Sequence, residues 1–189
     1  MPPVEHGAAT RDALTNTLTR PAFLGLLHDC ATRAAAGGEP FGVSVLDVDQ
    51  LTNVNDRHGL AAGDRVLAGI ARRALAELAQ ARWAGLECTL ARYDGDALVL
   101  LAQPADAARL MELAEALRLA IARKPLEDTT ITVSIGVAQH RIGESVDELL
   151  ARTERALHVA KQFGRDRVEL AATPASSPRR ASVRRLKHP

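Results

Sequence analysis

The hydrophobic positions of this chain follow two periods, and their alternation predicts a series of helices and strands. Apolar residues three and four positions apart indicate amphipathic helices, whereas short apolar runs rich in β-branched residues indicate buried strands. These patterns predict helices at 20–38, 51–56, 60–80, 104–123 and 145–164, and strands at 41–49, 88–93, 96–101, 129–138 and 166–170. Helices mixed with strands in this order are typical of an α/β or α+β sandwich, in which helices cover a partly antiparallel sheet.

A tight hairpin is expected between the strands at 88–93 and 96–101. The dipeptide Asp94-Gly95 is among the strongest signals for a two-residue type I′ turn, because both central residues of that turn need a positive φ. The turn brings the side chains of Asp94 and Asp96 to the tip of the hairpin. Acidic residues at such a tip raise the question of a catalytic or metal-binding loop.

Composition separates a central domain from two terminal segments. We expect residues 1–11 to be a disordered lead, residues 12–170 to form one domain, and residues 171–189 to be a disordered basic tail rich in proline, serine and arginine. Of the 24 lysine and arginine residues, five lie in the tail, which has none of the 23 acidic residues. The domain is therefore mildly acidic, and aromatic residues make up only 3% of the chain, so specific nucleic-acid binding is not expected.

Other broad classes are also disfavoured by the sequence. Cys30 and Cys88 lack the spacing of a zinc or redox site, and two reduced thiols are the simpler interpretation. No apolar run has the length of a transmembrane segment, and the N-terminus lacks the pattern of a signal peptide. We therefore expect a soluble, cytoplasmic protein without a transmembrane segment.

Acidic residues at strand ends suggest a cation site. Asp47 and Asp49 close an apolar strand, and a period of two places both on one face. If the strand that Asp96 begins is a neighbour, Asp47 and Asp96 converge and supply the oxygen ligands that Mg²⁺ prefers. On spacing alone, the commoner explanation is that these are ordinary acidic residues in turns.

A second group of polar residues suggests recognition of a nucleotide. The amide of Asn55 and the carboxylate of Asp64 can together recognise a guanine edge, although helix N-capping would equally account for both residues. Lys161 and Arg165 lie four positions apart near the end of an expected helix. They can bind phosphates, or they can simply complement the negative end of the helix dipole.

Taken in order, these stretches resemble the GGDEF domain of diguanylate cyclases, from about Asp12 to Val168. The matching stretches are DALTNTLTR, LDVDQLTNVND, GLAAGDRVL, ITVSIGVA and ALHVAKQFGRDRV. The resemblance implies a palm-like nucleotidyl-cyclase fold with a central, mostly antiparallel sheet flanked by helices. It also implies a bacterial signalling role, in which two domains meet as a homodimer and join two GTP molecules into cyclic di-GMP.

The resemblance assigns roles to individual positions. Asp47, the carbonyl of Val48 and Asp96 fall where the family holds Mg²⁺ or Mn²⁺, and Asp96 is also the candidate catalytic residue. Nucleotide-binding positions of the family fall on Gln50, Leu51, Thr52, Asn55, Asp64, Gly95, Lys161 and Arg165. Within this set, Asn55 and Asp64 match the guanine-reading positions, and the others match positions that contact phosphates.

The signature loop departs from the family pattern. It aligns with residues 94–98, where Asp94-Gly95 replaces Gly-Gly and Ala97 replaces the acidic residue of the fourth position. Alanine can neither bind a metal nor accept a proton, and losing such a group costs orders of magnitude in rate. Thr52 and Leu60 replace a lysine and a histidine of the family pattern, and the family's inhibitory R-x-x-D motif is absent from residues 85–88.

These departures lead to three hypotheses. We expect a degenerate, non-catalytic GGDEF domain of cyclic di-GMP signalling, which binds GTP or another guanine nucleotide and regulates a partner protein. The first alternative is an active or weakly active diguanylate cyclase in which Asp96 supplies the missing carboxylate. The second is a protein-interaction scaffold with a vestigial pocket, which Asp94, Thr52 and Leu60 favour.

Overall fold

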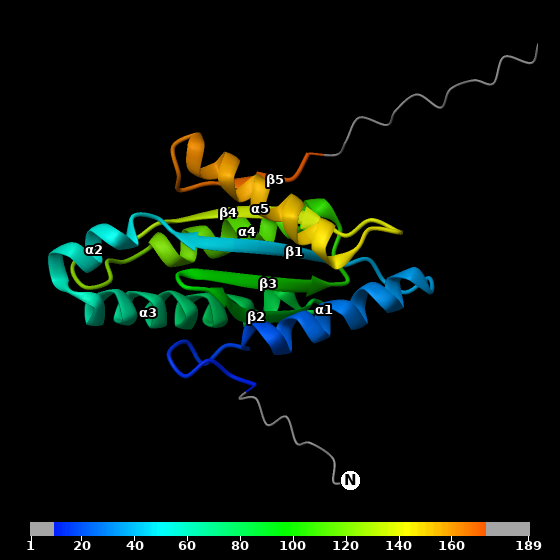
Figure 1. The fold of residues 1–189 in the computed structure, drawn as a ribbon, viewed down its shortest axis with the longest axis horizontal. Helices are drawn as coiled ribbons and strands as arrows, with labels where there is room; N and C mark the ends of the chain where they lie inside the picture. The colour runs from blue at the N-terminus through cyan, green and yellow to red at the C-terminus, as the bar shows by residue number, and fades with distance from the viewer. Residues whose placement is uncertain (1–9, 173–189) are drawn as a thin grey trace, which may run out of the picture.

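The computed structural model describes residues 10–172, which form a five-stranded sheet with helices packed on both faces (Figure 1). The residues up to 9 and from 173 onward, most of the two segments predicted to be disordered, lie outside the described residues. The helices are α1 (Arg20–Ala35), α2 (Leu51–His58), α3 (Leu60–Leu78), α4 (Ala107–Ala122) and α5 (Val146–Gln162), with a 3-10 turn at Ala81–Trp83. The strands are β1 (Gly42–Val48), β2 (Glu87–Asp94), β3 (Ala97–Gln103), β4 (Val133–Gln139) and β5 (Val168–Leu170).

The sheet is mostly antiparallel, as predicted. Its strand order is β2-β3-β1-β4-β5, and only the β4–β5 pair is parallel. The central strand β1 is buried along nearly its whole length, which explains its continuous apolar sequence. This topology places the C-terminal end of β1 beside the hairpin that joins β2 to β3.

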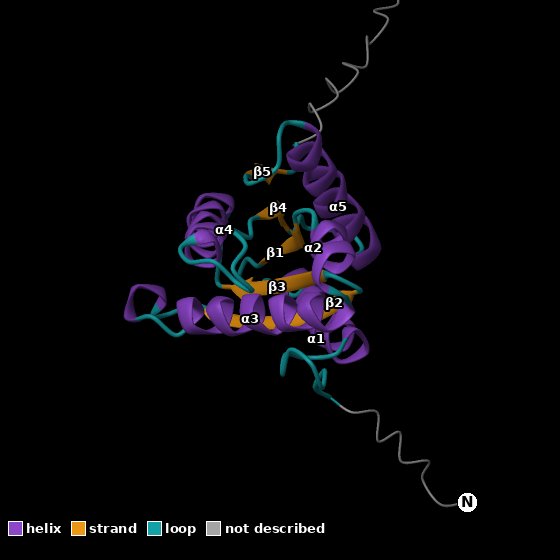
Figure 2. Ribbon diagram, turned by 90° about the vertical axis from the view of Figure 1, so that its left-hand side faces the viewer, coloured by secondary structure: helices purple, strands orange, loops and turns teal. Residues whose placement is uncertain are grey.

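Two hydrophobic cores lie on opposite faces of the sheet (Figure 2). Helices α3 and α4 cover one face through side chains such as Ile70 and Leu117, which are fully buried. Helices α1 and α5 cover the other face through side chains such as Leu27 and Leu149. Because each helix presents one apolar stripe to the sheet, the periodicity that predicted the helices is also what stabilises the layers.

Each predicted element occurs, with boundaries that local geometry adjusts. Helix α4 begins only after Asp106, whose carboxylate accepts a hydrogen bond from the Arg109 backbone N–H at 2.8 Å. The strand predicted from residue 129 begins at Val133, because Glu127 and Asp128 take left-handed backbone angles in a turn that precedes it. The two cysteines are free, and burial raises the pKa of Cys88 to about 11.

The hairpin turn lies one residue later than predicted. Strand β2 runs through Asp94, which pairs with Ala97, so the two loop residues are Gly95 and Asp96. Of these two, only Gly95 has a positive φ, of 45°, which fits a type II′ turn better than the predicted type I′ turn. An irregularity in the pairing between Arg92 and Asp94 shifts the register. The Asp94 side chain therefore lies at the end of a strand and not in the turn.

The described chain extends slightly beyond the predicted domain limits. Thr10 and Arg11, at the end of the predicted lead, form backbone and bridge contacts with Thr19 and Leu18. At the other end, the Ala171 backbone N–H donates to the carbonyl of Val137 at 2.7 Å. Within residues 10–172, none of the helices is long and apolar enough to cross a membrane.

Candidate functional site

The residues singled out in the sequence meet around the C-terminal end of β1. Asp47 lies on β1 directly opposite Ala97, the first residue of β3. The Asp96 carboxylate is close enough to Asp47 to affect its ionisation. Strands β1 and β3 are neighbours, which is the condition for Asp47 and Asp96 to converge. Joint binding of a cation by the two carboxylates stays a prediction, and Ala97, which faces Asp47, has no ligand atom in its side chain.

Asp47 forms an ion pair with Lys161 from the last turn of α5. The Lys161 ammonium lies 2.6 Å from Asp47 Oδ1, and the Asp47 side chain is only 15% exposed. Burial raises the pKa of the Asp47 carboxyl, Lys161 opposes this shift, and the charges of Asp96 and Asp49 reinforce it. The position of Lys161 is thus explained by a tertiary contact as well as by the helix dipole.

Asp49 has a different role from Asp47. Strand β1 ends at Val48, and the buried Asp49 carboxylate accepts hydrogen bonds from Thr132 Oγ1 and Ser134 Oγ, both at 2.7 Å. It also accepts one from the Asp166 backbone N–H at 3.1 Å. Asp49 therefore joins the end of β1 to β4 and to the segment after α5, and the sequence pattern did not reveal this contact.

Asn55 and Asp64 lie inside helices, so the N-capping explanation of these residues is wrong. Asn55 is in the middle of α2 and Asp64 is in the second turn of α3, and the N-cap positions are Gln50 and Gly59. Asn55 packs closely over Gly63: a Cβ atom added there would lie 1.9 Å from Asn55 Oδ1. Within the described residues, Asn55 Oδ1 is buried without a hydrogen-bond partner, which is uncommon in a folded protein and needs an explanation.

The segment after β1 presents backbone groups at the start of α2. Gln50 has a left-handed φ of 58° and precedes α2, which begins at Leu51. The first backbone N–H groups of a helix lack intrahelical partners and are suited to bind anions. Leu51 is buried and anchors the helix, whereas Thr52 is exposed. Gln50 also borders a cavity of about 170 Å³ on the side of α2 that carries Asn53 and Arg57.

Arg165 lies just beyond the end of α5, four residues after Lys161. It is exposed, with a left-handed φ of 63°, and its backbone N–H donates to the carbonyl of Ala160. The next residue, Asp166, donates its backbone N–H to Asp49 and accepts a hydrogen bond from Arg118 at 2.7 Å. These contacts hold the segment that carries Arg165 beside the end of β1.

Arg92 holds the hairpin in place, a role that sequence reasoning missed. Its guanidinium donates to the Gly95 carbonyl at 2.9 and 3.0 Å and forms an ion pair with Asp12 at 3.2 Å. Burial opposes ionisation of Asp12, but hydrogen bonds from Thr15 and the charge of Arg92 hold its pKa below the usual range. The only sequence signal was the presence of Asp12 and Thr15 in the N-terminal motif.

The described residues offer a limited set of metal ligands. Within residues 10–172, histidine, cysteine and acidic side chains do not form a group of three or more that could hold a metal ion. The carboxylates near the end of β1 are Asp47, which is paired with Lys161, Asp49 and Asp96. Asp49 already accepts hydrogen bonds from Thr132 and Ser134, so Asp47 and Asp96 are the candidate ligands. Two carboxylates are within the usual number for a Mg²⁺ ion whose coordination is completed by water and phosphates.

This chain is similar to several known proteins. Residues 9–167 match the family model described as "Diguanylate cyclase, GGDEF domain". The diguanylate cyclase DgcM of Escherichia coli is 35% identical over 171 residues, which cover 87% of this chain and 39% of DgcM. The response regulator PleD of Caulobacter vibrioides is 30% identical over 85% of this chain and 36% of PleD. The chain thus spans about two fifths of the length of these relatives.

Solved structures show the same fold. The coiled coil and GGDEF domain of DgcB from Caulobacter crescentus, in complex with c-di-GMP, superposes with a TM-score of 0.78 at 30% identity, covering 86% of both chains. The diguanylate cyclase SiaD of Pseudomonas aeruginosa, in complex with its activator SiaC, gives a TM-score of 0.77 at 32% identity, covering 87% of this chain and 62% of SiaD. The predicted palm-like cyclase fold is therefore confirmed.

Proposed function

Because this chain belongs to the GGDEF family of diguanylate cyclase domains, we propose that it binds a guanine nucleotide, GTP, and regulates a partner protein without making cyclic di-GMP. The observation that carries nucleotide binding is the buried, unpartnered Oδ1 atom of Asn55. Leaving such an atom without a partner costs about 1–3 kcal/mol. If the Asn55 amide turns outward on binding, a guanine base supplies the missing donor through its exocyclic amino group.

Asp64 completes recognition of the guanine in this proposal. Its exposed carboxylate accepts hydrogen bonds from the ring N–H and amino groups of the base. The side chains of α2 and α3 hold the base between them, and Gly63 leaves room for Asn55 to adopt its position. An adenine base presents a different donor pattern, so the pair discriminates between the two purines.

The phosphates lie between the start of α2 and the end of α5. Backbone N–H groups of the segment from Gln50 to Thr52, together with that of Gly95, cradle the phosphate oxygens, and Lys161 and Arg165 neutralise their charge. Binding therefore requires Lys161 to exchange Asp47 for a phosphate. The carboxylates of Asp47 and Asp96 and the carbonyl of Val48 would hold a Mg²⁺ or Mn²⁺ ion, which would supply positive charge to neutralise the phosphates.

The altered hairpin is the reason to propose binding without turnover. Ala97 faces Asp47 across the β1–β3 pair and offers neither a ligand atom nor a base for activation of the 3′-hydroxyl. The charge of Asp94, which is exposed at the end of β2, repels an incoming triphosphate. In this proposal, Asp96 is the acidic residue of the loop that remains to bind a metal ion or to accept a proton.

Two other functions remain as alternatives. Several relatives carry the name diguanylate cyclase, which favours an active enzyme that uses Asp96 and works as a homodimer. The exposed side chains of Thr52 and Leu60 stand where the family pattern has phosphate-binding and polar residues, and they favour a scaffold. The complex of SiaD with its activator is a precedent for a protein partner, and a cytoplasmic location stays a prediction.

Incubation with GTP and Mg²⁺ or Mn²⁺, followed by chromatography and thermal melting of the same samples, tests these functions. We expect no cyclic di-GMP and a rise in melting temperature that increases with GTP concentration. The variant Asn55→Ala should lose most of the rise, whereas Asn53→Ala on the opposite side of α2 should retain it. Formation of cyclic di-GMP would show that the protein is an active cyclase. If neither cyclic di-GMP nor a rise in melting temperature is observed, the protein-interaction scaffold becomes the favoured hypothesis.

A further inference from the structure

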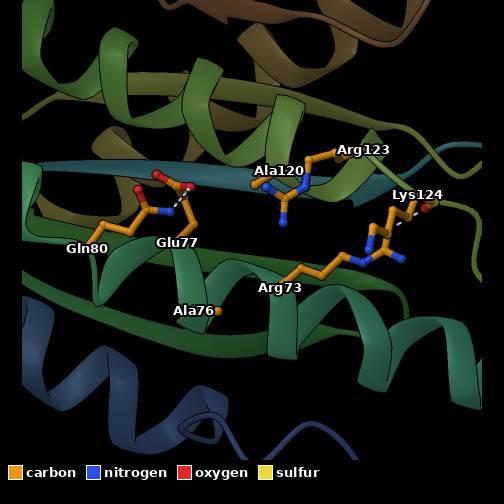
Figure 3. A pocket seen from close by; sticks show the side chains of 7 residues that line it. All are labelled: Arg73, Ala76, Glu77, Gln80, Ala120, Arg123 and Lys124. Atoms are coloured by element: carbon orange, nitrogen blue, oxygen red, sulfur yellow. Dashed lines mark hydrogen bonds between the residues drawn. The ribbon is translucent and has the colours of Figure 1, made fainter.

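A cavity of about 120 Å³ lies between α3 and α4, and it shares no residue with the candidate nucleotide site. Figure 3 shows three basic residues that line this space: Arg73 from α3, and Arg123 and Lys124 from the segment directly after α4. Ala76 and Ala120 leave the middle of the cavity open. The full lining consists of Arg73, Ala76, Glu77, Gln80, Ala120, Arg123 and Lys124.

Hydrogen bonds within the protein explain the position of one of the three basic residues, Arg73. Arg73 donates hydrogen bonds to the carbonyls of Ile121, Lys124 and Pro125, at 2.5, 2.6 and 3.0 Å. These carbonyls belong to the C-terminal end of α4 and the segment after it, where helix carbonyls lack intrahelical partners. Arg73 therefore closes the end of α4 and is held rigidly by it.

The other two basic residues lack such an explanation. Within residues 10–172, the side chains of Arg123 and Lys124 form neither a hydrogen bond nor an ion pair. Burial lowers the pKa of the Arg73 guanidinium, and the nearby charges of Arg123 and Arg72 lower it further. Like charges held close together cost free energy. The Glu77 carboxylate, whose pKa Arg123 helps to lower, and the exposure of Arg123 and Lys124 to solvent offset part of this cost, and a bound anion would offset more.

Glu77, the acidic residue of the cavity, is neutralised mainly from the other side, and Arg123 adds a weaker electrostatic attraction. Its Oε1 atom accepts hydrogen bonds from Arg82 and from the Trp83 indole, and its Oε2 atom accepts one from Gln80 at 2.7 Å. Glu77 also forms an ion pair with Arg82, and the Glu77 side chain is buried. The end of the cavity that carries Arg73, Arg123 and Lys124 is therefore positive.

We propose that this α3–α4 cavity binds a phosphate group, either as inorganic phosphate or as the phosphate of a small monoester. Its volume exceeds the minimum for a single water, about 10–15 Å³, and lies below the roughly 300–1,000 Å³ of pockets for drug-sized ligands. A tetrahedral oxyanion matches this size. Arginine provides paired N–H donors for phosphate oxygens, and Lys124 adds a point charge.

The test compares melting temperatures in phosphate and in chloride at equal ionic strength. Phosphate also stabilises proteins without binding to a site, so the informative quantity is the difference between variants. We expect Arg123→Gln to melt at about the same temperature as the unaltered protein in chloride, because it removes a like charge beside Arg73 but also a favourable charge near Glu77 and the end of α4. In phosphate, Arg123→Gln should gain several degrees less than the unaltered protein.

Arg155→Gln is the matched control, because Arg155 is an exposed arginine on α5 and its removal changes the net charge equally. It should keep the full phosphate effect. If phosphate raises the melting temperature of both variants equally, the proposed phosphate site is wrong and the rise is a nonspecific ion effect. A titration followed by amide NMR shifts should saturate at residues around Arg73 and Arg123, and a linear response without saturation would also overturn it.

The same titration distinguishes the two sources of the phosphate group. Glycerol phosphate should compete with inorganic phosphate if both bind through the same group. Tighter binding of glycerol phosphate would identify a phosphorylated metabolite as the ligand, and tighter binding of inorganic phosphate would identify the free ion. Failure of this site would not affect the proposed function, because GTP-dependent melting depends on Asn55 and not on Arg123.

Discussion

Single residues show how closely this site depends on small differences in side-chain volume. Gly63 lies under Asn55, and the two residues belong to successive helices that approach each other closely. Glycine is needed here because of space and not because of backbone angles, since Gly63 is helical with a negative φ. Because Gly63 has no Cβ atom, the Asn55 amide that we propose to recognise guanine can occupy its observed position.

Replacing this glycine provides a prediction at the residue scale. We expect Gly63→Ala to destabilise the fold by about 1–3 kcal/mol, because the new Cβ overlaps Asn55 Oδ1 and forces a rearrangement. Gly25→Ala is the matched control: Gly25 is also helical, and an added Cβ meets no atom within 4 Å. The control should be neutral or stabilising by up to ~1 kcal/mol in urea unfolding.

If Gly63→Ala unfolds at the same urea concentration as the Gly25 variant, the close packing of α2 against α3 would be disproved. Nucleotide binding supplies a second measurement. Because the new methyl group displaces the Asn55 amide, the GTP-dependent rise in melting temperature should fall in Gly63→Ala. The rise should be unchanged in Gly25→Ala.

Individual elements are fixed by polar contacts at their ends. Helix α5 begins with a capping box: the Ser145 hydroxyl accepts a hydrogen bond from the Glu148 backbone N–H, and the Glu148 carboxylate accepts one from the Ser145 backbone N–H. Nearby, Glu144 forms a buried ion pair with Arg152 at 2.6 Å, with both side chains no more than 10% exposed. These contacts orient α5, whose other end delivers Lys161 to Asp47.

The Glu144–Arg152 pair predicts a pH dependence at the element scale. Burial opposes ionisation of Glu144, but the hydrogen bond and charge of Arg152 hold its pKa below the usual value. Because this pKa is lower in the folded state than in the unfolded state, the ionised carboxylate stabilises the fold. The stabilisation is fully present above the unfolded-state pKa of about 4.3. It is lost as pH falls through the folded-state pKa. The protein should therefore lose stability at acidic pH below about 4.

The variant Glu144→Gln separates this contribution from those of other carboxylates. At neutral pH its free energy of unfolding should be about 3–5 kcal/mol lower than that of the unaltered protein, because the Arg152 charge is left buried and unpaired. Below pH 4 the difference from the unaltered protein should shrink. A difference that stays constant between pH 7 and pH 3 would show that ionisation of Glu144 does not contribute.

The hairpin between β2 and β3 is held by Arg92. Replacing it in Arg92→Gln removes the charge that joins Asp12 and the Gly95 carbonyl. We expect faster amide hydrogen exchange at the turn and in the 12–18 segment, with little change in the centre of β3. Unchanged exchange at the turn would mean that strand pairing alone holds the hairpin.

At the scale of the whole molecule, catalysis requires two copies of the domain in the family mechanism. The double variant Asp94→Gly with Ala97→Glu restores the family pattern of the loop. If the loop alone prevents turnover, this variant should form cyclic di-GMP from GTP and Mg²⁺ at a rate well above that of the unaltered protein. Absence of product, in a variant that binds GTP and dimerises, would assign the loss to other departures such as Thr52 and Leu60.

The amino-acid sequence by itself determined the order of the elements and the family. Helical and strand periods are local properties, and the ordered motifs span nearly the whole domain, so both can be read without a structure. Strand ends were predicted less well where turn geometry intervened. The hairpin turn is the clearest example, because the pairing of Asp94 with Ala97 moved it by one residue.

The tertiary structure alone decided which polar residues are paired and which are free. Lys161 pairs with Asp47, Asp49 joins β1 to β4, and Asn55 Oδ1 remains buried without a partner within the described residues. The partners lie far apart in the sequence, and periodicity holds no information about such contacts. They depend on how the helices pack on the sheet, which brings distant side chains within hydrogen-bonding distance.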